Sequence, residues 1–177
     1  MDLPAGMTIF PLEPHPDRRG WLLEAYRKSW LPDVSSEQVN LTWSRANTLR
    51  GTHVHGLHSD YFVLASGRAF VGIQDARKRS ATFGMAALIE LSSERPTALS
   101  VPPGVLHGVY FPVDSMLVTV ESLTYDPLEE IGCRWNDPEL AIPWPFTSPI
   151  LSDADRTAQS YAEMMAAIEP WQADYVI

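Results

Sequence analysis

Three histidines and one carboxylate lie in two short motifs of this chain. His53 and His55 fall in residues 49–55, Asp60 follows shortly after, and His107 comes directly after a proline-glycine turn at residues 102–104. Alternate residues of a β-strand face the same side, so His53 and His55 are expected on one face. An imidazole titrates near neutral pH and serves as a general base or as a metal ligand. Three imidazoles that meet at motif spacing therefore predict a functional site more than structural histidines.

The segments around these histidines are predicted to be short β-strands. Turn signals recur every few residues along the chain, which favours a sandwich or barrel. Ser66-Gly67 predicts a tight hairpin, residues 112–115 predict a turn within another strand pair, and residues 29–36 could hold one short helical turn. The expected strands cover residues 7–10, 20–27, 39–43, 61–65, 69–73, 83–91, 98–101, 109–111 and 116–121.

The C-terminal segment has a different pattern. Residues 153–168 carry Ala, Met, Gln and Glu at helical spacing, and Ser152 or Asp153 is a suitable cap. We therefore predict an all-β barrel with one C-terminal helix in a single domain, 1–177. Within it we expect N-terminal strands and an arm over 1–47, the barrel core with the site motifs over 48–127, and the C-terminal segment over 128–177.

Composition excludes several classes of function. A formal net charge of -9 argues against a nucleic-acid partner, which requires a basic face. Cys133 is the single cysteine, so the chain has no internal disulfide and no cysteine-rich zinc site. The N-terminus lacks the pattern of a secretion signal, and no long apolar run is suited to span a membrane. We expect a cytoplasmic protein without a membrane partner.

The motifs resemble those of the cupin jelly-roll superfamily and, more narrowly, of nucleotide-sugar epimerases typified by dTDP-4-dehydrorhamnose 3,5-epimerase. The matching segments follow the family order over nearly the whole chain, so the resemblance implies a cupin jelly-roll barrel. They are residues 17–24, 49–53, 82–84, 101–108, 134–145 and 149–155.

The resemblance implies a reaction in which a proton leaves the carbon beside a ketone. His53 matches the general base of the family, and Asp155 matches the carboxylate that pairs with it. Arg50 matches a residue on the diphosphate or near the sugar. The further matches to substrate-binding positions are Arg19, Glu24, His107 and Tyr125. A nucleotide-sugar substrate, a homodimer and the absence of a cofactor are the corresponding expectations.

Two positions depart from the family pattern. Asp60 stands where the family has a lysine that stabilises the enolate, so a negative charge replaces a positive one. Thr119 stands at about the position of the catalytic tyrosine, and a threonine hydroxyl donates a proton far less readily than a phenol. The implied reaction is epimerisation at carbon 3, carbon 5 or both, and loss of that acid suits epimerisation at one carbon, a relative that uses a different proton donor, or loss of the epimerase activity.

The departures leave alternative hypotheses open. His53, His55, Asp60 and His107 match the three-histidine, one-carboxylate metal pattern of cupins, which suits a divalent transition metal in a dioxygenase or isomerase. In that case His53 would be a ligand and not a free base; we favour the metal-free base. A nucleotide-sugar 3,4-ketoisomerase and a non-catalytic sugar-binding cupin are the further alternatives. Solvated positions are expected for His15, His58, Arg45, Arg68, Arg77, Lys78 and Arg79.

Overall fold

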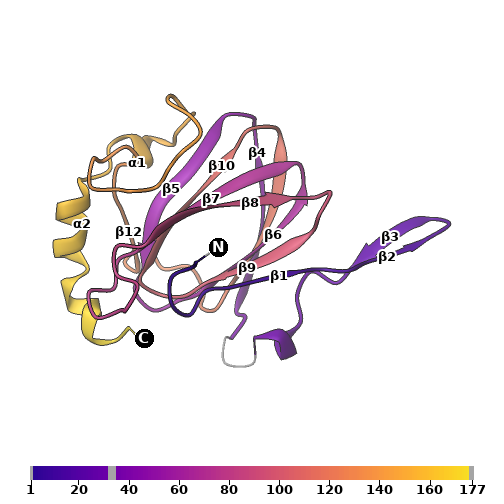
Figure 1. The fold of residues 1–177 in the computed structure, drawn as a ribbon, viewed down its shortest axis with the longest axis horizontal. Helices are drawn as coiled ribbons and strands as arrows, with labels where there is room; N and C mark the ends of the chain where they lie inside the picture. The colour runs from indigo at the N-terminus through magenta and orange to yellow at the C-terminus, as the bar shows by residue number, and fades with distance from the viewer. Residues whose placement is uncertain (1, 32–34, 176–177) are drawn as a thin grey trace.

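Two facing antiparallel β-sheets form the body of the protein in a computed structural model that describes residues 2–31 and 35–175 (Figure 1). The first sheet has the order β1-β9-β6-β11-β4, and the second has the order β12-β5-β10-β7-β8. The strands of the first sheet are β1 (Thr8–Pro11), β4 (Gln38–Ser44), β6 (Asp60–Ser66), β9 (Thr97–Val101) and β11 (Ser115–Glu121). Those of the second are β5 (Thr48–His55), β7 (Arg68–Asp75), β8 (Ala86–Ser92), β10 (Val105–Phe111) and β12 (Glu130–Gly132). The predicted jelly-roll barrel is confirmed.

The remaining strands, β2 (Pro14–Asp17) and β3 (Gly20–Leu23), pair with each other in a hairpin that projects from the barrel (Figure 1). This hairpin is the expected N-terminal arm. β1 and β4, also within residues 1–47, belong to the barrel itself. The helical turn predicted within residues 29–36 appears as the 3-10 helix η1 (Lys28–Trp30), and residues 32–34 of that prediction lie outside the described residues.

The apolar core fills the space between the two sheets. Every residue of β10 is buried, because one face of this strand meets the core and the other lies under the C-terminal segment. The residues buried between the sheets include Phe62, Leu64, Val71, Ile73, Leu99, Val109, Phe111 and Leu117. Burying each such side chain contributes about 1.5–3 kcal/mol to the stability of the fold, so the shared core holds the two sheets together.

The outer face of the second sheet is covered by the C-terminal segment (Figure 1). Met164 and Ile168 pack there against Val54 and Leu106. Gly72 allows this cover to approach, since a Cβ atom at that position would lie 2.4 Å from the ring of Trp144. The C-terminal segment therefore buries the back of the strands that carry the histidine motifs.

The helical tail is confirmed, but it is divided. Helix α1 (Asp153–Arg156) is capped by Ser152, α2 (Tyr161–Ala167) is capped by Ser160, and the 3-10 helix η2 (Glu169–Ala173) follows. Ser160 and Glu163 form a capping box, which starts a new helix where the prediction continued the first one. No helix within residues 2–31 and 35–175 is long and apolar enough to cross a membrane.

Two predicted hairpins are wrong. Strands β6 and β7, on either side of Gly67, lie in different sheets, and so do β10 and β11 around residues 112–115. Gly67 has a φ of +87° and lets the chain turn from one sheet to the other beside Ser115. A glycine turn can join two strands of one sheet or connect two sheets, and only the packing of both core faces decides between them.

Arg77 is also placed differently from the prediction. Its side chain is 1% exposed and donates to both carboxylate oxygens of Asp75, with Nε–Oδ1 and Nη2–Oδ2 distances of 2.8 Å each. A third hydrogen bond, 2.7 Å long, joins the guanidinium to the carbonyl of Ala5. The expected solvated arginine is instead part of a buried ion pair.

Candidate active site

The two histidine motifs meet on neighbouring strands of the second sheet. His53 of β5 lies opposite His107 of β10 in the ladder, and the register shifts directly after His107. Gly51 permits this irregular pairing: its φ is +100°, and a Cβ atom there would lie 2.9 Å from the carbonyl oxygen of His107. The glycine next to the motif is therefore required by the close approach of the two strands.

A cavity of about 300 Å³ opens beside these strands, between the two sheets. It brings together seven of the ten site residues predicted from the sequence, namely Arg50, His53, His55, Asp60, His107, Thr119 and Tyr125. The other residues that line it are Asn40, Thr42, His58, Phe62, Val109, Leu117, Glu121 and Glu130.

His53 and Asp155 form a hydrogen-bonded pair at the wall of this cavity. His53 Nε2 lies 2.9 Å from Asp155 Oδ1, and Ser152 donates to the other oxygen of Asp155 at 2.8 Å. Asp155 sits in the first turn of α1, directly after its cap, so the helix start fixes the carboxylate. Because a carboxylate only accepts, Nε2 carries the proton and Nδ1 is the basic nitrogen. The pairing inferred from the resemblance is present in the structure.

The surroundings of His53 raise its basicity. Burial by itself would lower the pKa of His53, but the hydrogen bond with Asp155 and the charge of Glu130 outweigh it and raise the pKa above its ordinary value. Burial likewise opposes ionisation of Asp155, yet hydrogen bonds with His53 and Ser152 keep the pKa of this carboxyl low. The result is an ionised carboxylate behind an imidazole whose basicity is increased.

Asp60 is surrounded by imidazoles. Its Oδ2 atom lies 3.0 Å from His107 Nε2 and 3.3 Å from His55 Nε2, and its Oδ1 atom lies 3.9 Å from His58 Nε2. Burial would raise the pKa of Asp60, but the hydrogen bonds with His107 and His55 lower it strongly. The carboxylate at position 60 is therefore buried and ionised, with three imidazole rings around it.

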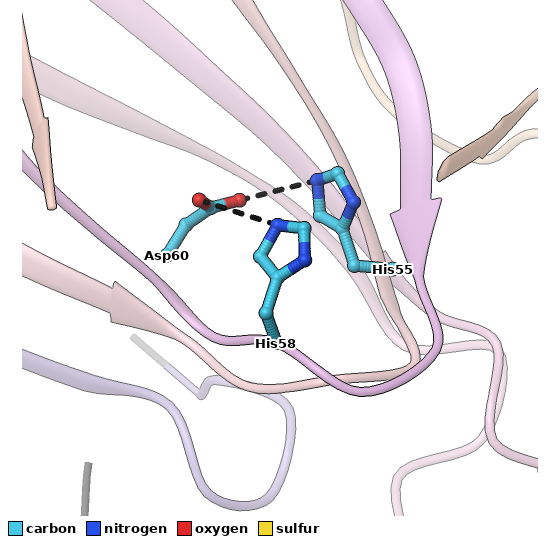
Figure 2. Close-up of side chains that lie close together, drawn as sticks. All are labelled: His55, His58 and Asp60. Atoms are coloured by element: carbon cyan, nitrogen blue, oxygen red, sulfur yellow. Dashed lines mark ion pairs between the residues drawn. The ribbon is translucent and has the colours of Figure 1, made fainter. Parts of the chain in front are cut away.

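His58 was expected to be solvated, and that prediction is wrong. The residue is 3% exposed, and its Nδ1 lies 2.6 Å from Glu129 Oε2. The loop between β5 and β6 turns this side chain inward, toward Asp60 (Figure 2). Its spacing of three residues from His55 lies outside any strand alternation, so the local pattern carried no signal for it.

The structure separates the four residues of the metal alternative. His53 is joined to Asp155, with Glu130 on its second nitrogen at 3.6 Å, whereas Asp60 is joined to His55 and His107. The group whose donor atoms all lie within 4.8 Å of one another consists of His55, His58 and Asp60. His53 therefore lies apart from the set of donor atoms that could hold an ion.

Two predicted substrate contacts lie away from this cavity. Arg19 is on the projecting hairpin, where it pairs with Asp17, and Glu24 pairs with Arg27. Neither residue lines the cavity of its own chain.

Sequence reasoning missed two carboxylates in the cavity. Glu121 follows Thr119 on the same face of β11, and Glu130 lies on β12 opposite His55. The pKa of Glu121 is raised by burial and by the nearby charge of Asp60. Strand alternation from Thr119 could have identified Glu121, whereas the short strand that carries Glu130 was not predicted.

Comparisons with known proteins identify relatives of this chain. The family model for dTDP-4-dehydrorhamnose 3,5-epimerase matches residues 3–163. The enzyme of that name from Mycobacterium tuberculosis is 31% identical over 94% of this chain and 88% of its own length. A dTDP-4-dehydro-6-deoxyglucose 3-epimerase from Streptomyces bikiniensis is 31% identical over 90% of this chain and 87% of its own length.

Among solved structures, the dTDP-4-dehydrorhamnose 3,5-epimerase of Bacillus anthracis with TDP and PPi bound superposes with a TM-score of 0.82. It is 33% identical and covers 88% of this chain and 94% of its own. Sequence similarity of this extent, a shared fold and the His53–Asp155 pair at the cavity lead to one conclusion. This chain belongs to the dTDP-4-dehydrorhamnose 3,5-epimerase family.

Proposed function

We propose that this protein is an epimerase of a nucleotide-linked 4-keto-deoxysugar, with His53 as the base and no metal needed for proton abstraction. The carrying observation is the 2.9 Å contact between His53 and Asp155 at the cavity wall. Two relatives that are each 31% identical to this chain act on dTDP-linked 4-dehydro sugars, as their names state. A thymidine nucleotide sugar is the substrate that this similarity favours.

The reaction breaks a C–H bond next to the ketone. The proton moves to Nδ1 of His53, the electron pair passes to the carbonyl oxygen to form an enolate, and Asp155 stabilises the imidazolium. Return of a proton to the other face of the carbon completes the inversion. The pKa of His53 is raised, so this nitrogen is a stronger base than an ordinary imidazole.

The opposite wall of the cavity supplies the candidates for the returning proton. Thr119 and Glu121 lie on the same face of β11, in the sheet that faces His53. Asn40 donates to Glu121 Oε1 at 2.6 Å and holds the carboxyl group in place. Burial and the charge of Asp60 raise the pKa of Glu121, and a carboxyl group is a better proton donor than the hydroxyl group of Thr119. We assign the proton donor to Glu121.

The nucleotide would enter from the open side of the cavity. Arg50 is aimed by its hydrogen bond to Ser44 Oγ, 2.9 Å long, and is suited to a diphosphate. Tyr125 is 54% exposed and lines the cavity, where its ring can stack on a base.

We also propose a homodimer. The outer face of the edge strand β4 exposes Val39, Leu41 and Trp43, and a contiguous apolar face on an edge strand favours pairing with a second copy. In that dimer the projecting hairpin would bring the partner's Arg19 and Glu24 to the nucleotide.

The direct test is nuclear magnetic resonance of a dTDP-4-keto-6-deoxysugar in deuterated water, with chelator-treated protein. Deuterium should replace hydrogen at carbon 3, carbon 5 or both, and signals of the inverted sugar should appear. Exchange at one carbon identifies a monoepimerase. If neither carbon exchanges with any 4-keto nucleotide sugar although dTDP binds, the chain is a binding module and the proposal is wrong.

A further inference from the structure

We infer that His55, His58 and Asp60 form a binding site for one divalent first-row transition-metal ion, separate from the His53–Asp155 pair. The donor atoms of these three residues lie within 4.8 Å of one another, and all three side chains are buried. Figure 2 shows both rings directed at the carboxylate, each facing a different oxygen. This inference goes beyond the proposed function and does not depend on it.

The spacing of the donor atoms suits an ion. His55 Nε2 lies 3.3 Å from Asp60 Oδ2, and His58 Nε2 lies 3.9 Å from Asp60 Oδ1. Ligands at 2.0–2.2 Å from one ion are separated by roughly 3.0–3.5 Å in tetrahedral or octahedral geometry. A small movement of His58 toward Asp60 would bring all three donor atoms within reach of one ion. The remaining coordination positions of that ion would be open toward the cavity.

The backbone holds the three residues in place. His55 ends β5, Asp60 begins β6, and the intervening loop is fixed at both ends. Gly56 in this loop packs so closely on the ring of Trp171 that a Cβ atom would lie 2.7 Å from it. The backbone amide of Ser59 donates to Ser122 Oγ at 2.8 Å. The site is thus held before any ligand arrives.

Hydrogen bonds around the site resemble the outer shell of metal centres. His58 Nδ1 lies 2.6 Å from Glu129 Oε2, so this nitrogen carries the proton and Nε2 presents its lone pair to the site. Imidazole ligands commonly donate their other N–H to a carboxylate in this way. His107 Nδ1 is fixed by the carbonyl of Val105 at 3.1 Å, and His107 Nε2 orients Asp60 from 3.0 Å.

Charge also favours a dication. The rings of His55 and His58 have centroids 3.9 Å apart, so two imidazoles lie side by side next to the carboxylate of Asp60. His55 Nδ1 is buried and has no hydrogen-bond partner among the described residues. Of the described residues that line the cavity, Arg50 is the only arginine or lysine, whereas Asp60 and Glu130 add two carboxylates to Glu121, the proposed proton donor. A dication bound at Asp60 would offset the negative charge of that carboxylate.

The donor types indicate which ion fits. Two imidazoles and one carboxylate suit zinc, iron, nickel, cobalt or manganese, whereas magnesium and calcium prefer oxygen ligands alone. When bound, such an ion supplies a Lewis acid for a substrate oxygen. Because His53 is not one of the ligands, an ion and a free base fit in the same cavity.

The test uses untagged protein, stripped with a chelator and titrated with Co²⁺ and Zn²⁺. We expect about one equivalent per chain by equilibrium dialysis and elemental analysis, with visible d–d bands for Co²⁺. His58→Gln and Asp60→Asn should each weaken binding at least tenfold, and Glu129→Gln should weaken it about 10- to 100-fold. Circular dichroism verifies that each variant is folded. If His58→Gln or Asp60→Asn does not fold, Glu129→Gln still tests the site, because it leaves all three ligands in place.

Two controls separate this site from other sources of binding. His15→Gln removes an exposed histidine of the arm and should bind like the unchanged protein. His53→Asn should also retain the ion, whereas loss in that variant would favour the four-residue set that includes His53. Binding below about 0.1 equivalent, or equal affinity in His58→Gln, Glu129→Gln and the unchanged protein, would overturn the inference. Deuterium exchange by the metal-free protein is measured separately. Absence of metal binding would therefore leave the epimerase proposal intact, and absence of exchange would leave the metal site intact.

Discussion

Asp155 lies 2.9 Å from His53, although 102 residues separate them in the sequence. His53 belongs to a barrel strand and Asp155 to the first turn of a helix packed beside that strand. The C-terminal segment therefore both covers the outer face of the second sheet and supplies the carboxylate that pairs with His53.

Asp155→Asn should lower the rate of deuterium exchange on the order of 10²–10⁴-fold, because an amide no longer stabilises the imidazolium. Asp153→Asn is the matched control, since this carboxylate is on the same helix turn and fully exposed. Initial exchange rates of both variants are measured at one pH. Equal effects of the two substitutions would show that helix stability, and not the pair, is responsible.

Glu121→Gln should slow inversion more than it slows exchange of the original hydrogen. The base side of the reaction stays intact in this variant, whereas the donor on the opposite wall loses its proton. Thr119→Val removes the neighbouring hydroxyl and should have the smaller effect. The ratio of inverted product to deuterated substrate is read from the same spectra, and the reverse ranking would assign the donor to Thr119.

Arg50→Gln should weaken dTDP binding about 10- to 100-fold, which corresponds to loss of a charge-assisted hydrogen bond of about 1.5–3 kcal/mol. Arg45→Gln removes an exposed arginine just before the same strand and should bind normally. Isothermal titration calorimetry with dTDP measures both. Unchanged affinity in Arg50→Gln would remove the diphosphate role from this residue.

Subunit complementation tests the dimer. An Arg19→Ala/Glu24→Ala variant and His53→Asn should each have little activity. After subunit exchange, half of the dimers are mixed and each has one complete site, so about one quarter of the activity should return. If the arm served its own chain, the mixed dimers would contain no complete site and no activity would return.

The buried Asp75–Arg77 pair should control stability at low pH. Burial opposes ionisation of Asp75, but hydrogen bonds from Arg77, Thr82 and Ser80 lower its pKa. Its stabilising contribution is therefore present above the unfolded pKa of about 3.9 and is lost as pH falls through the lower folded value.

Replacement of the arginine tests this pair. Arg77→Met should reduce the free energy of unfolding at pH 7 by about 3–5 kcal/mol, because Asp75 becomes a buried unpaired charge. The deficit should narrow as acid protonates Asp75. Arg68→Met breaks an exposed pair with Glu90 and should cost under about 1 kcal/mol. Urea unfolding from pH 7 to pH 3 compares the two, and equal losses would contradict a structural role for the buried pair.

The sequence predicted the barrel and seven of the residues that line the cavity, because these depend on patterns that are local or follow the family order. Strand alternation predicted that His53 and His55 share a face, and both line the cavity. The pairing of His53 with Asp155 came from the resemblance, because no local pattern connects a strand to a distant helix.

The errors have a common physical origin. Gly67 indicates a turn, but only core packing determines that the chain passes to the other sheet. His58 and Arg77 are polar and near turns, yet both are buried because each pairs with a carboxylate. His58 pairs with Glu129, and Arg77 pairs with Asp75. Burial of a charged side chain depends on its partners in space, which a single sequence does not reveal.

The most direct test of the central claim is deuterium incorporation by His53→Asn, measured beside His15→Asn with a dTDP-4-keto-6-deoxysugar in deuterated water. Loss of the base should abolish incorporation at the carbon next to the ketone, while dTDP still binds. His15→Asn should exchange at the rate of the unchanged protein. Persistent incorporation in His53→Asn would show that another group removes the proton.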